Sequence, residues 1–116
     1  MNTGYFGRVK SYPKDLKLVS IARFNRYWGG EKYATLAPTP DMLSIADEAA
    51  YTALYCERIL SKLDPQRVYA ELGDNAVLLC FEKWDDIKTG KKFCHRRIVA
   101  KWLEDNIEGL GVKELE

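Results

Sequence analysis

Six consecutive apolar residues, AVLLCF, occupy positions 76–81, between a Gly-Asp-Asn turn signal and Glu82. The run is short for a helix, and it lacks the alternation of a half-exposed strand, so it predicts a strand that is covered on both faces. A second run, KLVSIA at 17–22, brings Leu18, Val19 and Ile21 close together in the same manner. Two buried strands with enough chain between them for a crossover predict a right-handed parallel connection.

Helix signals fill the chain between and after these strands. Thr39, Pro40 and Asp41 form a helix start, because a hydroxyl cap precedes a proline and an acid. The expected helices are residues 40–63, with a break near Ala49, residues 65–72, with Gly73 as the stop, and residues 95–108, with Gly109 as the stop. The other expected segments are a lead-in at 1–5, loops at 23–39 and 82–94, and an edge strand at 112–115.

A chain of 116 residues has room for one domain. We therefore predict a single α/β domain over residues 1–116, a compact three-layer unit with a mostly parallel sheet.

The charge of the chain is balanced in total and uneven in distribution. Eighteen basic and 17 acidic side chains give a formal charge of +1, which argues against a generally basic nucleic-acid binder. Segment 8–32 nevertheless holds seven basic and two acidic residues, and segment 88–101 holds six basic residues and no acid. Each segment contains a loop near a predicted strand end, and the carboxyl ends of parallel strands share one edge of a sheet.

We expect these two loops to meet in one cleft that attracts an anion beside a helix N-terminus. The residues expected around it are Arg23, Arg26, His95, Arg96 and Arg97. The alternative is that these side chains only solvate an exposed face.

Location and redox state follow from what the sequence lacks. No stretch is long and apolar enough for a membrane span, and the first ten residues lack the apolar region of a signal peptide, so we expect a cytoplasmic protein with no membrane partner. Three cysteines without CxxC spacing do not indicate a disulfide framework, so we expect reduced thiols.

Cys94 and His95 are the first candidates for chemistry. A thiol near a helix N-terminus and two guanidinium groups is favoured as thiolate, and His95 is the only imidazole available as a general base. Cys80 and Glu82 end the apolar strand and point to the same face of an extended chain. In the alternative interpretation both cysteines are small core residues, and Glu82 pairs with an arginine.

Metal and nucleotide-loop motifs receive little support. Cys80, Cys94 and His95 are poor zinc candidates, because two ligands are adjacent, a fourth is not evident and two arginines are neighbours. The arginine that a thiolate phosphatase loop needs six positions after its cysteine is Ala100 here, and Gly29 and Gly30 form no phosphate or dinucleotide fingerprint. We expect no metal and no cofactor.

Cations and aromatic rings alternate in RFNRYW at 23–28. Arg23 and Arg26 could bind phosphates while Trp28 stacks on a flat ring, or the aromatic side chains could fold inward as a lid on the core.

Three segments resemble a known family: LVSIARFNRYWGGEKYATLAPTPDML, YCERILSKLDPQRVYAEL, and VLLCFEK with CHRRIVAKWLE. In order and spacing, over residues 18–104, they are similar to the bacterial and archaeal family catalogued as domain of unknown function 488, with its Leu-Cys-x-Glu and Cys-His-Arg motifs. The resemblance implies a compact α/β domain with a site at the strand ends. The matching site residues are Cys80, Glu82, Cys94, His95 and Arg96.

These observations predict a domain that binds a small anionic ligand, phosphate-bearing or nucleotide-like, with thiol and histidine catalysis as an extension. The alternatives are a nucleic-acid-binding module that uses the basic loops, and a non-catalytic interaction domain.

Overall fold

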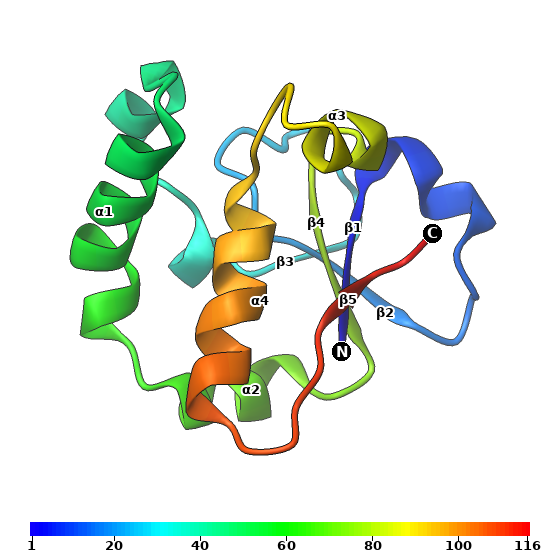
Figure 1. Ribbon diagram of the computed structural model, residues 1–116. Coiled ribbons are helices and arrows are strands. Elements are labelled where there is room, and N and C mark those ends of the chain that lie inside the picture. The colour runs from blue at the N-terminus through cyan, green and yellow to red at the C-terminus, as the bar shows by residue number, and fades with distance from the viewer.

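Five parallel strands form one sheet in the order β3-β2-β4-β1-β5 (Figure 1). The structure, a computed structural model, describes residues 1–116. The strands are β1 (Asn2–Tyr5), β2 (Lys17–Ser20), β3 (Glu31–Lys32), β4 (Ala76–Cys80) and β5 (Lys113–Glu114). All five residues of β4 are buried at the centre of the sheet, and Val19 of β2 lies opposite Leu78 of β4. The predicted pair of buried parallel strands is therefore confirmed.

Strand β1 corrects the prediction that residues 1–5 are a lead-in. Its four residues pair with β4 in parallel, and Asn2 and Thr3 pair with β5 on the other side. The segment NTGY has no apolar run, so its sequence gives little strand signal. Gly4 is required there because an added Cβ would lie 2.6 Å from the Tyr12 hydroxyl. The strand forms because both of its edges find partners.

Helices cover one face of the sheet and part of its carboxyl edge. They are α1 (Glu48–Arg58), α2 (Pro65–Leu72), α3 (Trp84–Lys88) and α4 (His95–Asn106), with short 3₁₀ helices η1 (Phe6–Ser11), η2 (Ala34–Leu36), η3 (Pro40–Ser44) and η4 (Leu60–Lys62). The expected short helix at 65–72 is confirmed, with Asp64 as its cap and Gly73 at φ 90° as its stop. The start of α4 at His95 is also as predicted, although the helix ends at Asn106, before Gly109.

The long helix expected over 40–63 is instead three pieces, η3, α1 and η4. The chain is extended at Ile45 and Asp47, and the Asp47 carboxylate accepts a hydrogen bond from the Ala50 N–H at the start of α1. The first break therefore lies before Ala49, and a second lies at Ile59, between α1 and η4. Helix α3 falls in the stretch that was expected to be loop.

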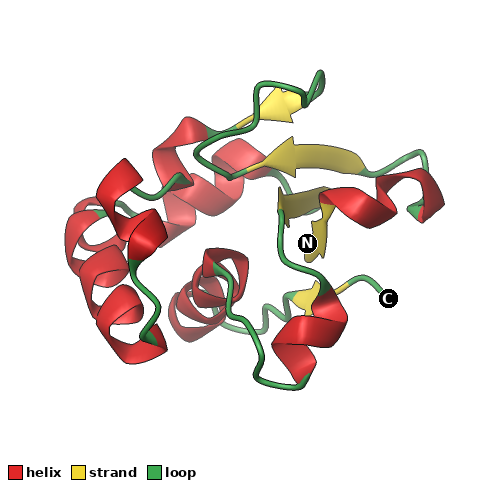
Figure 2. Ribbon diagram, turned by 90° about the horizontal axis from the view of Figure 1, so that it is seen from above, coloured by secondary structure: helices red, strands yellow, loops and turns green.

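The two faces of the sheet carry separate apolar clusters. Helices α1, α2 and α4 pack on one face, where Tyr55, Leu72 and Leu103 join Val19 and Leu78 in the main core. The thinner layer on the opposite face contains η1 and Tyr12, which cover Val77 and Leu79 of β4 (Figure 2). These layers agree with the predicted single α/β domain. No helix in the structure combines the length and apolarity that a bilayer crossing requires.

Candidate functional site

A pocket of about 580 Å³ opens at the carboxyl ends of β2 and β4. Arg23 and Phe24 line it from the segment after β2, Glu82 lines it from the segment after β4, and Cys94 and His95 line it from the start of α4. The expectation that the segment after β2 and the segment leading into α4 meet at one edge of the sheet is therefore confirmed.

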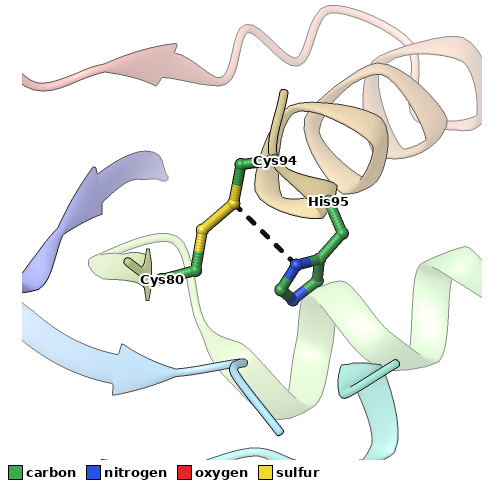
Figure 3. Close-up of side chains that lie close together, drawn as sticks. All are labelled: Cys80, Cys94 and His95. Carbon is green, nitrogen blue, oxygen red and sulfur yellow. Dashed lines mark hydrogen bonds between the residues drawn. A yellow bond between two sulfur atoms is a disulfide. The ribbon is translucent and has the colours of Figure 1, made fainter. Parts of the chain in front are cut away.

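Cys80 and Cys94 form a disulfide beside this pocket (Figure 3). The expectation of three reduced thiols is wrong for this pair, because the fold brings the end of β4 against the start of α4 across a sequence separation of 14 residues. Both residues are buried, at 1% and 4% exposure. Cys56 is the free cysteine, and it lies exposed on α1.

Glu82 stays close to the strand end. Its Oε2 lies 3.5 Å from the Cys80 Sγ atom, and it forms no ion pair. The expected pairing of Glu82 with an arginine is wrong: Arg23 donates to the Pro38 carbonyl at 2.6 Å, and Arg96 donates to Glu114. Its carboxylate is therefore available to the pocket.

His95 is held in one orientation by a backbone carbonyl. Its Nε2 atom lies 2.7 Å from the Ile21 oxygen, and its Nδ1 atom lies 3.9 Å from the Cys94 Sγ atom (Figure 3). A carbonyl only accepts hydrogen bonds, so Nε2 carries the proton of the neutral ring and Nδ1 presents its lone pair toward the sulfur. Burial lowers the pKa of His95 to about 4, against the opposing effect of the Ile21 hydrogen bond and with a further lowering by Arg96. The imidazole is therefore neutral at physiological pH.

Arg96 does not line the pocket. Its Nε and Nη2 atoms donate to the two carboxylate oxygens of Glu114 at 3.0 and 2.9 Å, and both side chains are buried. Its Nη1 atom donates to the Cys80 sulfur at 3.1 Å. The prediction that Arg96 binds an anionic ligand is therefore wrong in this structure, because Glu114 already satisfies its charge.

Arg97 also points away from the pocket. Its Nη1 atom donates to the Thr3 hydroxyl at 2.9 Å and to the Val112 carbonyl at 3.1 Å, and its guanidinium carbon lies 5.7 Å from the centre of the Trp84 ring. Successive residues of a helix are rotated by about 100°. At the start of α4, His95 therefore faces the pocket, Arg96 faces the buried Glu114, and Arg97 faces the edge near β1.

Three cations do line the pocket, namely Arg23, Lys91 and Lys92. The sequence identified Arg23 but not the two lysines, although both belong to the basic segment that precedes Cys94. The acidic residues of the lining are Glu48 and Glu82, so the net charge of the lining side chains is weakly positive.

A second pocket, of about 800 Å³, adjoins the first and shares Arg23, Phe24 and Phe81 with it. Arg26 and Trp28 line this second pocket and not the first, which corrects their expected place in one common cleft. Three aromatic side chains are exposed here: Phe24 at 65%, Tyr27 at 89% and Phe81 at 56%.

The rings of this loop are held differently from one another. The Trp28 ring packs 5.4 Å from that of Phe6, and its Nε1 donates to the Glu31 carbonyl at 2.9 Å. Trp28 is therefore partly a lid on the core, as one of the two interpretations expected. Arg26 lies over the exposed Tyr27 ring at 4.8 Å and donates to its hydroxyl. Tyr27 is the most exposed ring of this loop, and Arg26 covers one of its faces.

The residues that could hold a metal ion are Cys80, Cys94 and His95, whose ligand atoms all lie within 4.8 Å of one another. Comparison with known protein families, curated proteins and solved structures finds no match to this chain.

Proposed function

We propose that the protein binds a small anionic molecule in the pocket at the carboxyl ends of β2 and β4. One observation carries the proposal: cations from two separate segments, Arg23 and the pair Lys91 and Lys92, surround one concave site. Parallel sheets commonly bind ligands at this edge. The carboxylate of Glu82 in the same lining would accept a hydrogen bond from a hydroxyl group of the ligand.

The adjoining aromatic pocket supports a nucleotide-like ligand. Because the two pockets share Arg23 and Phe24, a phosphate in the first pocket places an attached ring at the second. Exposed aromatic side chains such as Tyr27 stack on flat rings and contribute about 1–3 kcal/mol per base. A ligand with both groups would therefore bind more tightly than phosphate alone.

Catalysis at Cys94 remains a prediction within this proposal. A sulfur in a disulfide is not a nucleophile, so such a reaction requires the reduced pair. Membership of family 488 and a cytoplasmic location likewise remain predictions.

Calorimetric titration with inorganic phosphate and with adenosine monophosphate tests the anion site. We expect Arg23→Ala and Lys92→Ala each to weaken binding about 10- to 150-fold, since a hydrogen bond to a charged group contributes roughly 1.5–3 kcal/mol. Arg67→Ala is the matched control, because Arg67 lies on α2 at the opposite end of the sheet (Figure 1). Equal affinity in all three variants, or no binding by the unmodified protein, would contradict the proposal.

A second candidate is a module that binds single-stranded nucleic acid, which the 89% exposure of Tyr27 beside Arg26 favours. Its affinity for an oligonucleotide should fall steeply with salt and should drop on Tyr27→Ala. Binding of the mononucleotide with no binding of the oligonucleotide would exclude it. If neither ligand binds, the third alternative, a non-catalytic interaction domain, is favoured.

A further inference from the structure

We propose that, when the disulfide is reduced, Cys80, Cys94 and His95 bind a zinc ion whose fourth coordination position opens into the pocket. The zinc site does not depend on the proposed anion-binding function, because its three ligands are not the cations that line the pocket. The sequence argued against a metal on three grounds: two ligands are adjacent, a fourth is not evident, and arginines are neighbours. In the structure the fourth position can open into the pocket, and the adjacent Arg96 is paired with Glu114.

The three ligand atoms converge from two elements of the fold. The Cys80 and Cys94 sulfurs and the His95 Nδ1 atom lie within 4.8 Å of one another at the junction of β4 and α4 (Figure 3). All three residues are buried, so the fold and not solvent determines their approach. Two thiolates and an imidazole are the donor set that zinc favours.

His95 is oriented as a ligand before any metal binds. Its Nε2–H donates to the Ile21 carbonyl at 2.7 Å, which leaves the Nδ1 lone pair directed toward the sulfurs. Metal-binding histidines are commonly held in this manner, with the second ring nitrogen donating to a carbonyl or carboxylate. This hydrogen bond fixes both the tautomer and the plane of the ring.

The buried charges balance when zinc is bound. Two thiolates neutralise Zn²⁺, and the adjacent Arg96 is neutralised by its two hydrogen bonds to Glu114. The arginine that opposed a cation in the sequence argument therefore brings no net positive charge to the site. Its Nη1–H, which lies 3.1 Å from the Cys80 sulfur, would instead donate to a metal-bound thiolate.

The backbone separation of the cysteines also suits a shared metal. Their Cα atoms are 7.4 Å apart in the oxidised protein. Two thiolates on a tetrahedral zinc, at about 2.3 Å each, have sulfurs roughly 3.8 Å apart and so accommodate more widely spaced cysteines.

The fourth position faces the pocket, because all three ligands belong to its lining. A site with three protein ligands and one open position is the type that binds water or substrate. Glu82, with its Oε2 atom 3.5 Å from the Cys80 sulfur, is near enough to accept a hydrogen bond from a zinc-bound water.

Metal loading is a balanced exchange. A phosphine reductant supplies the two electrons that cleave the S–S bond, and one water molecule supplies the two protons of the thiols and the oxygen of the phosphine oxide that forms. Zinc then displaces one proton from each thiol, so two protons are released per ion bound.

The test is a zinc titration of the reduced, metal-free protein in competition with the chromogenic chelator pyridylazoresorcinol. We expect one zinc per chain, with a dissociation constant on the order of 10⁻⁷ M or tighter. Cys80→Ser, Cys94→Ser and His95→Gln should each weaken binding by at least about 100-fold, since even outer partners of a metal site contribute 10–100-fold. Cys56→Ser is the matched control, because that cysteine is exposed on α1, and it should bind as the unmodified protein does.

Cobalt substitution reports the ligands without relying on variants that fold. The reduced protein should show a sulfur-to-cobalt charge-transfer band and tetrahedral ligand-field bands, and the oxidised protein of the same sequence should show neither. Addition of imidazole, a neutral ligand that needs no anion site, should shift the ligand-field bands, because the open position exchanges its water. Absence of stoichiometric zinc binding, a spectrum without the sulfur band, or bands insensitive to imidazole would overturn the proposal.

The outcomes separate this site from the anion site. Zinc binding by a protein whose metal-free form binds no phosphate would remove the proposed function and leave the zinc site standing. Phosphate binding without zinc binding would remove the zinc site and leave the proposed function standing.

Discussion

The buried pair of Arg96 and Glu114 joins α4 to the edge strand β5. Both side chains are almost fully buried, at 0% and 1% exposure. The Glu114 carboxylate accepts two hydrogen bonds from Arg96 and one from the Thr3 hydroxyl at 2.7 Å. Glu114→Gln removes the negative charge and leaves the guanidinium buried without a counter-ion.

Loss of one partner from a buried ion pair typically destabilises a protein by about 3–5 kcal/mol. With a urea dependence of about 2 kcal/mol per molar, the midpoint of unfolding should fall by roughly 2 M. Circular dichroism in a urea series measures this midpoint and shows whether the slope is unchanged. The matched control is Asp105→Asn, which breaks the exposed pair of Lys101 and Asp105 and should change stability by less than about 0.5 kcal/mol.

A double variant separates lost attraction from an uncompensated charge. Arg96→Met with Glu114→Leu replaces both partners by apolar side chains, and it should be more stable than Glu114→Gln alone. The reasoning would be refuted if Glu114→Gln lost less than about 1 kcal/mol, because the guanidinium would then be solvated and not buried.

Two further changes test the packing of the sheet and the buried tyrosines. Gly4→Ala should destabilise the protein by about 1–3 kcal/mol in a thermal or urea melt, because its Cβ would lie 2.6 Å from the Tyr12 hydroxyl. Gly29→Ala meets no atom within 4 Å and should be neutral. Equal stability of the two variants would show that the Tyr12 ring moves aside and is not packed tightly against β1. Burial raises the pKa of Tyr51, and Glu82 raises it further. The contribution of Tyr51 to the free energy of unfolding should therefore be constant below its unfolded pKa of about 10 and should fall as the pH rises above that value. In urea melts, Tyr51→Phe should reduce the slope of that fall by up to about 1.4 kcal/mol per pH unit. The control is Tyr27→Phe, at an exposed ring, which should leave the slope unchanged. A Tyr51→Phe profile identical to that of the unmodified protein would show that the Tyr51 hydroxyl is not shielded from solvent.

The strands at 17–20 and 76–80 could be predicted because they are apolar on both faces, and such segments must be covered wherever they fold. The helix at 65–72 was equally evident, since proline and glycine act locally at its two ends. Strand β1 was missed because its four residues contain no apolar run and include Asn2 and Gly4, which are unfavourable in strands. Pairing with β4 and β5 makes it a strand, and pairing is not written in a local pattern.

The candidate site, like the fold, could be predicted from the sequence only in part. The sequence placed Cys80, Cys94 and His95 near one edge because that follows from the order of strands and helices. It could not separate His95 from Arg96, which are adjacent in the chain and face opposite surroundings in the fold.

The sequence by itself determined the class of the fold, the central strand and the edge where polar groups collect, because apolar runs and cap residues act over a few positions. The tertiary structure decided which side chains meet there. It bonded the Cys80 and Cys94 sulfurs, directed the His95 lone pair toward them and paired Arg96 with Glu114, 18 positions away in the chain. Such contacts depend on the packing of α4 against the sheet and on the direction of each side chain around the helix, and a local sequence pattern carries no record of either.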